Sequence, residues 1–139
     1  MTTGNDGLRR VYITGALGFL GRHVARSFAY SGWRVVGIGH QSTPVGTHAP
    51  WGIADLAVGE VSVNLLQDAH QRFGAPSLVV HAAGTSSVWQ AAEDPCGELG
   101  RTVGSTGAVV DYIRRFAPQA RLIYVSSAAI YGNAPVVPI

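Results

Sequence analysis

The stretch Thr14-Gly15-Ala16-Leu17-Gly18-Phe19-Leu20-Gly21 decides the fold of this chain. It follows a short β-branched run at residues 10–14, which is typical of a buried parallel strand. Apolar residues at helical spacing follow it over residues 20–28. Glycines at such a strand-to-helix turn let a diphosphate lie against backbone N–H groups, where larger side chains would hold it away. We therefore interpret the turn as a dinucleotide-binding turn, and the alternative is a plain tight turn.

Strand-like and helix-like segments alternate along the rest of the chain. The expected strands are 10–14, 34–38, 52–54, 78–81 and 121–126, and the expected helices are 20–32, 62–73 and 94–116. Parallel strands joined by such crossovers form a doubly wound α/β sheet. We expect a Rossmann-type domain over residues 10–139, with strand order 3-2-1-4-5 and no strand after the fifth, preceded by a polar tail at residues 1–9.

Composition excludes several classes of protein. A chain of 139 residues with 47% apolar and 13% charged residues has enough apolar surface to fold around one core. No apolar run approaches the roughly 20 residues of a membrane helix and the N-terminus is polar, so we expect neither a signal peptide nor a membrane partner, and a cytoplasmic location. The basic residues are all scattered arginines, which argues against nucleic acid. The sequence shows no metal-ligand spacing.

Four further motifs follow the glycine turn. They are Asp55-Leu56, His81-Ala82-Ala83-Gly84, Asp94-Pro95 and Ser126-Ser127-Ala128-Ala129-Ile130-Tyr131-Gly132. With the glycine turn they resemble the extended short-chain dehydrogenase/reductase family, in its nucleotide-sugar epimerase/dehydratase group. The resemblance implies NAD or NADP across the carboxyl ends of the strands, reversible hydride transfer at a carbon of a nucleotide sugar, and a homodimer in the full-length form.

The resemblance also assigns residues to the cofactor. It places the amides of Phe19 and Leu20 beside the phosphate glycines, Asp55 and Leu56 around the adenine, and the small residues after His81 under the cofactor. The full expected set is Gly15, Gly18, Phe19, Leu20, Gly21, His40, Asp55, Leu56, Ala82, Ala83 and Gly84. The alternative interpretation of Asp55 is a loop acid or a helix cap. His81 is interpreted as structural or cofactor-lining rather than catalytic.

The sequence leaves the choice between the two cofactors open. A site that prefers NAD usually carries an acid about 20 residues beyond the glycines, where this chain has Gly39-His40. No arginine lies nearby to pair with a 2′-phosphate, although His40, Gln41 and Ser42 could donate to one. Without an acid at this position, no carboxylate repels the 2′-phosphate of NADP, which slightly favours NADP.

Ser127 matches the catalytic serine of the family, although a serine at a strand end also caps backbone. The family's Tyr-x-x-x-Lys motif is absent because the chain contains no lysine. That lysine lowers the pKa of the tyrosine so that a phenolate acts near neutral pH. We therefore expect the N-terminal, cofactor-binding part of a longer enzyme, inactive alone. The alternative function is a non-catalytic dinucleotide-binding or assembly module.

One helix pattern stands apart from these motifs. Gly97, Gly100, Gly104 and Gly107 recur at spacings that place them on one face of a continuous helix. Interior glycines destabilise a helix, so the pattern indicates close approach of another helix or a ligand, or else composition drift. The strand near residues 122–125 is expected to leave an uncovered apolar edge.

Overall fold

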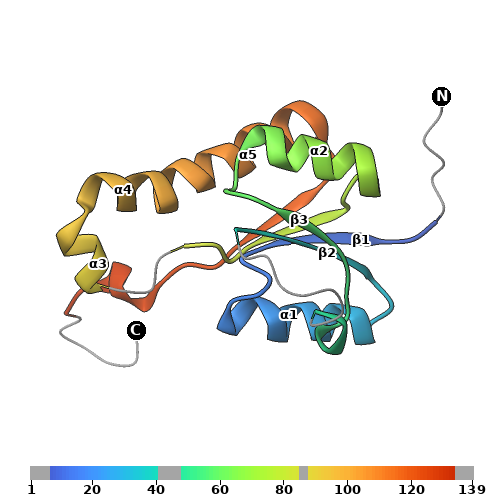
Figure 1. The fold of residues 1–139 in the computed structure, drawn as a ribbon, viewed down its shortest axis with the longest axis horizontal. Coiled ribbons are helices and arrows are strands. Elements are labelled where there is room, and N and C mark those ends of the chain that lie inside the picture. The colour runs from blue at the N-terminus through green and yellow to red at the C-terminus, as the bar shows by residue number, and fades with distance from the viewer. Residues whose placement is uncertain (1–6, 41–47, 85–87, 134–139) are drawn as a thin grey trace.

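Five parallel strands form the centre of the molecule, with helices on both faces of the sheet (Figure 1). The computed structural model describes residues 7–40, 48–84 and 88–133. The strands are β1 (Arg10–Thr14), β2 (Arg34–Gly39), β3 (Ile53–Val58), β4 (Leu78–His81) and β5 (Arg121–Tyr124). The α-helices are α1 (Phe19–Tyr30), α2 (Val63–Phe73), α3 (Val88–Glu93), α4 (Pro95–Leu99) and α5 (Ser105–Phe116). Shorter segments are the 3-10 turns η1 (Ala49–Trp51) and η3 (Ala128–Tyr131) and the π-helical segment η2 (Gly100–Gly104).

The strand order is β3-β2-β1-β4-β5, and every neighbouring pair is parallel. This confirms the predicted Rossmann-type sheet and its order. Helix α1 lies on one face, while α2 and α5 lie on the other (Figure 1). The order of the strands reverses between β1 and β4, and sheets of this class bind ligands in the crevice outside the carboxyl ends at such a point. Among the described residues, no helix is both long and apolar enough to cross a bilayer.

The sheet separates two apolar clusters. Successive residues of β1 alternate between them, since Val11 and Ile13 pack toward α1 whereas Tyr12 packs toward α2 and α5. All three side chains are fully buried. The Tyr12 hydroxyl donates to the carbonyl oxygen of Gly74 over 2.7 Å, which satisfies the polar atom of that buried ring. Burial on both faces explains why the strands read as nearly continuous apolar runs.

Strand β3 corrects the expected boundary at residues 52–54. It runs from Ile53 to Val58 and therefore contains Asp55 instead of ending before it. The neighbouring strand β2 supplies Arg34, whose Nε and Nη2 donate to the two carboxylate oxygens of Asp55 over 2.7 and 3.0 Å. A bidentate pair of this kind lets a carboxylate lie inside a strand. The partner of Asp55 is 21 residues away in the sequence, so local patterns do not reveal the pair. For this reason the sequence suggested that the strand ends before Asp55.

The expected helix over residues 94–116 begins as predicted but is not continuous. Asp94 caps α4 by accepting from the amide of Gly97 over 2.9 Å, and Pro95 occupies the first turn. The π-helical segment η2 then separates α4 from α5. Helix α3, which the sequence analysis did not predict, precedes α4. These interruptions correct the expectation of one uniform helix.

The glycines of this region do not share one packed face. Gly97 and Gly100 line a cleft at the carboxyl ends of the strands, whereas Gly107 lines a groove beside β5. Within the described residues, nothing comes within 4 Å of a Cβ placed at Gly100 or Gly107. The structure therefore shows no close approach at these two positions.

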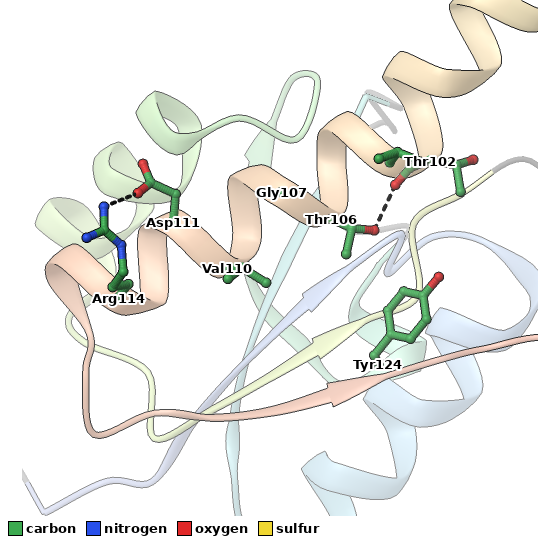
Figure 2. Close-up of a pocket in the computed structure, with 8 residues that line it drawn as sticks. Thr102, Thr106, Gly107, Val110, Asp111, Arg114 and Tyr124 are labelled. Carbon is green, nitrogen blue, oxygen red and sulfur yellow. Dashed lines mark hydrogen bonds and ion pairs between the residues drawn. The ribbon is translucent and has the colours of Figure 1, made fainter.

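Strand β5 forms an exposed edge of the sheet, as expected. Leu122, Ile123 and Tyr124 are 37%, 48% and 50% exposed. Figure 2 shows the groove between this strand and the helix region formed by η2 and α5, with Tyr124 below Val110 and Thr106. Its volume is about 490 Å³.

Two histidines lie in or beside the core. His81 ends β4 and is 1% exposed. His70 on α2 is half-buried, with its Nδ1 3.0 Å from the hydroxyl oxygen of Tyr112. Burial lowers the pKa of both imidazoles below their ordinary value of 6.5, because the charged form loses hydration.

We expect the free energy of unfolding to decrease when the pH is lowered from about 7.5 to about 5.5. The unfolded chain binds protons on these imidazoles near pH 6.5, whereas the folded protein keeps both neutral to a lower pH, so acid favours the unfolded state. Asp94 and Asp111 do not contribute here, because hydrogen bonds lower their pKa below 3.8. Urea denaturation at the two pH values measures the change. His70→Gln should weaken the dependence, and equal stability of the wild type at both pH values would contradict it.

Candidate functional site

A cleft of about 620 Å³ opens at the carboxyl ends of β1 to β4. Its walls come from the glycine turn, the ends of β2, β3 and β4, and the helix region around η2. The lining residues are Gly15, Leu17, Gly18, Gly39, His40, Gly59, Glu60, Val61, Ala82, Ala83, Gly84, Gly97, Gly100, Arg101 and Ser105. The cleft thus lies where the topology of the sheet places a ligand.

Gly15 joins three strand ends at one point. Its backbone has φ +69°, a left-handed conformation that glycine adopts without strain. A Cβ at this position would lie 2.9 Å from both the carbonyl oxygen of Ala82 and the amide nitrogen of Ala83. The Gly15 amide itself donates to the carbonyl oxygen of Ile38 on β2 over 2.8 Å. Both the conformation and the close approach therefore require glycine here.

Gly18 and Gly21 bring the start of α1 against this turn. A Cβ at Gly18 would lie 3.2 Å from the carbonyl oxygen of Gly15, and one at Gly21 would overlap that same atom. Gly18 is the N-cap residue and provides no side-chain cap, and the first turn of α1 contains no acid. The first amide groups of a helix have no intrahelical acceptor, and they carry the positive end of the helix dipole. This arrangement is suited to an anion.

Phe19 and Leu20 enter the site through their backbone only. Their side chains are 77% and 47% exposed and do not line the cleft. The Phe19 ring contacts the ring of His23, with centroids 5.4 Å apart. Because these two residues form the first turn of α1, their amides are the groups that the sequence analysis expected beside a phosphate.

The ends of β2 and β3 form the wall farthest from β4. The amide of Gly59 donates to the carbonyl oxygen of Gly39 over 2.8 Å, which holds the two strand ends together. His40 lines the cleft on the β2 side, and Glu60 and Val61 line it on the β3 side. Glu60 is the functional candidate that the sequence analysis missed. The sequence could have indicated Glu60 by its position directly after the end of β3, at Gly59-Glu60. The expected end of this strand at residue 54 hid that position.

Asp55 and Leu56 lie outside the cleft, and a role for them beside a bound adenine stays a prediction. The carboxylate of Asp55 is engaged with Arg34 inside the sheet, and Leu56 packs over Gly37. Neither residue lines the cleft. The physical reason is the length of β3, because its carboxyl end lies at Val58 and not before Asp55.

The segment after β4 forms the side of the cleft next to Gly15. Ala82, Ala83 and Gly84 all line it, as expected for small residues beneath a ligand. The amide of Ala83 donates to Thr14 Oγ1 over 3.2 Å, and the amide of Ala82 donates to the Thr14 carbonyl oxygen over 3.2 Å. These bonds fix the segment to the end of β1.

Arg101 is the one arginine among the residues that line the cleft, and it comes from η2. Its Nη1 lies 3.3 Å from Asp94 Oδ2, and its Nε lies 3.7 Å from Glu98 Oε2. The Gly97 amide and the Arg101 guanidinium lower the pKa of Asp94 by hydrogen bonding to its carboxylate. Arg101 is therefore already paired with acids of its own helix region.

Ser127 lies outside the cleft. It is the N-cap residue of η3, and its Oγ accepts from the amide of Ala129 over 3.2 Å. The geometry thus shows the capping that the sequence left open, and a catalytic role stays a prediction. Across residues 7–40, 48–84 and 88–133, no three His, Cys, Asp or Glu side chains gather into a group that could hold a metal ion.

Known proteins resemble the chain over nearly its whole length. UDP-glucuronate 4-epimerase 4 of Arabidopsis thaliana is 25% identical over 145 residues, which cover 99% of this chain and 33% of that protein. The crystal structure of UDP-glucose 4-epimerase from Brucella ovis in complex with NAD is 28% identical, with a TM-score of 0.79 over 94% of this chain and 39% of that one. The crystal structure of UDP-glucose 4-epimerase from Bifidobacterium longum in complex with NAD+ and UDP is 23% identical, with a TM-score of 0.82. The match covers 94% of this chain and 40% of that one, and it supports the fold.

The chain therefore spans about a third of the length of that curated relative and about two fifths of those two structures. The model of the NAD dependent epimerase/dehydratase family matches residues 11–139. This match includes the glycine turn, every strand end at the cleft and the helix region around η2. The chain belongs to the NAD dependent epimerase/dehydratase family.

Proposed function

We propose that this chain binds NAD in the cleft and forms the cofactor-binding part of a nucleotide-sugar epimerase-type enzyme. The observation that carries the proposal is the glycine turn, which presents the uncapped first turn of α1 beside a cleft floored by the ends of four strands. Backbone N–H groups at a helix N-terminus bind phosphate well. Gly15 and Gly18 let the turn lie close to the Ala82–Ala83 backbone and to the start of α1, where a Cβ would be 2.9 to 3.2 Å from backbone atoms.

The residues of the cleft fit such a cofactor from end to end. The amides of Phe19 and Leu20 would hold the diphosphate, and the wall formed by His40, Glu60 and Val61 would hold the adenosine. Ala82 and Ala83 would lie under the nicotinamide half, where small side chains leave room. Bound there, NAD would supply the hydride acceptor for oxidation of a sugar carbon.

Glu60 supplies the acid that is missing from the end of β2. It lies on the strand end beside Gly39-His40, to which the bond between Gly59 and Gly39 connects it. A carboxylate there would accept from a ribose hydroxyl of NAD and repel the 2′-phosphate of NADP. The sequence alone slightly favoured NADP because the acid seemed absent. With Glu60 at the cleft, NAD is the proposed cofactor.

The proposed substrate is a UDP-sugar, since the relatives that this chain resembles are epimerases of UDP-glucuronate and UDP-glucose. Ser127 is proposed to hold the reacting oxygen of the sugar, as the family resemblance implies. A lysine-assisted tyrosine would have to move the proton, and these 139 residues contain no lysine. The chain therefore supplies the cofactor cleft and one catalytic residue.

A non-catalytic dinucleotide-binding or assembly module is the second candidate function. Both functions include NAD binding, and they differ in one observable property. Only an enzyme that combines this chain with the Tyr-x-x-x-Lys residues would interconvert a UDP-sugar and its epimer when the sugar nucleotide and NAD are supplied together.

Gly18→Asp should abolish NAD binding, with an affinity loss of roughly a hundredfold or more. The substitution places a carboxylate where the diphosphate would meet the helix N-terminus, so bulk and charge both oppose binding. Isothermal titration calorimetry with NAD measures the affinity. Gly107→Asp adds the same side chain at an open position outside the cleft and should bind as the wild type does. Full NAD affinity in folded Gly18→Asp would contradict the proposal.

Glu60→Gln and Asp55→Asn should separate cofactor binding from stability. Loss of the Glu60 charge should weaken NAD binding by about fivefold, narrow the preference for NAD over NADP, and change stability by less than about 0.5 kcal/mol. Asp55→Asn should lower the free energy of unfolding by about 1 kcal/mol through the partly exposed pair with Arg34, and leave NAD affinity unchanged. Calorimetry and urea denaturation on both variants provide the test. The reverse pattern would return the cofactor role to Asp55.

A further inference from the structure

A buried imidazole outside the cleft connects its walls. His81 is 1% exposed at the end of β4, and both of its ring nitrogens have partners. Nδ1 lies 2.6 Å from Thr14 Oγ1, and Nε2 lies 3.0 Å from Thr106 Oγ1. The ring also lies beside that of Tyr124, with centroids 5.9 Å apart. The imidazole does not line the cleft of the proposed cofactor site. Its hydrogen-bond partners, however, belong to two elements next to the cleft, the end of β1 and the start of α5.

The hydrogen bonds of Thr106, on the helix side of His81, determine which ring nitrogen carries a proton. Thr106 Oγ1 lies 2.7 Å from the carbonyl oxygen of Thr102, a bond drawn in Figure 2. A carbonyl oxygen accepts only, so the single hydroxyl proton of Thr106 is used in that bond. Thr106 Oγ1 must therefore accept from His81 Nε2, which carries the ring proton.

The sheet side of the network fixes the other end. A neutral imidazole protonated at Nε2 has a bare Nδ1, so this nitrogen accepts from the hydroxyl of Thr14. Thr14 Oγ1 in turn accepts from the amide of Ala83 over 3.2 Å. The bonds then run in one direction, from the Ala83 amide through Thr14, His81 and Thr106 to the Thr102 carbonyl oxygen, and each donor is used once.

One end of this series of hydrogen bonds, Ala83, lines the cleft, and the other end, Thr102, directly follows Arg101, which also lines it. Thr14 immediately precedes Gly15, and Ala83 lines the side next to the glycine turn. Thr102 belongs to η2, which carries Gly100 and Arg101 into the cleft from the helix side. Burial lowers the pKa of His81, which keeps the ring in the neutral form that the network requires. Thr106 itself lines the groove beside β5 and not the cleft.

We propose that His81, held as its Nε2–H tautomer between Thr14 and Thr106, is a positioning residue that sets the spacing of the glycine turn, the Ala82–Ala83 segment and η2 for cofactor binding. The inference rests on the proposed NAD-binding function. It assigns the imidazole an indirect role, because its ring nitrogens are both occupied by threonine hydroxyls. Its effect on the cofactor passes through Thr14 and Ala83 on the sheet side and through Thr106 and Thr102 on the helix side.

The tautomer is tested directly on the wild-type 139-residue chain by NMR of the ¹⁵N-labelled imidazole rings. The expected spectrum shows His81 protonated at Nε2 and bare at Nδ1 at about neutral pH. Protonation at Nδ1 alone, or at both nitrogens, would overturn the proposal. This measurement needs no variant, so a folding defect cannot obscure it.

The positioning role is tested by calorimetry with NAD on Thr106→Val and Thr106→Ser. Thr106→Val removes the acceptor of the Nε2 proton at a position outside the cleft, and should weaken NAD binding by about fivefold and shift the ¹⁵N signals of His81. Thr106→Ser keeps the hydroxyl and should retain both the affinity and the signals. NAD affinity in folded Thr106→Val equal to that of the wild type would overturn the positioning role alone. Absence of NAD binding by the wild type would overturn the proposed function, and this inference with it.

Discussion

The close approach of Gly15 to the backbone of Ala82 and Ala83 is the contact on which the rest of the site depends. Only a residue without Cβ fits where two backbone atoms would lie 2.9 Å from that carbon. The approach brings the ends of β1 and β4 together at the point where the strand order reverses. Helix α1 can then start at the carboxyl ends of the central strands, and the cleft opens in front of its first turn. Fold and proposed function therefore share one constraint.

The sequence predicted the parts of the molecule that local patterns determine. The glycine turn between residues 14 and 21, the β-branched strands and the cap formed by Asp94-Pro95 were all identified, and the sheet order followed from the general rules of crossover topology. These features need only neighbours along the chain or rules that hold for the whole fold class. They were sufficient to identify the family resemblance that the family model confirms.

Features that depend on distant partners could not be predicted in the same way. Asp55 lies inside β3, where Arg34 of the neighbouring strand pairs with it, and the strand continues to Val58. Glu60 was missed as a consequence, although it stands at the cleft. The π-helical segment η2 has no periodicity signal of its own, so α4 and α5 read as one helix. The partners of His81 come from β1 and from α5, and no spacing pattern reveals them.

The proposed function depends on the first turn of α1 binding the diphosphate of NAD, and a crystal structure of this chain grown with NAD is the decisive measurement. We expect diphosphate oxygens within hydrogen-bonding distance of the Phe19 and Leu20 amide nitrogens, over the Gly15–Gly18 turn. A diphosphate bound anywhere else on the molecule, with those amides facing solvent, would contradict it.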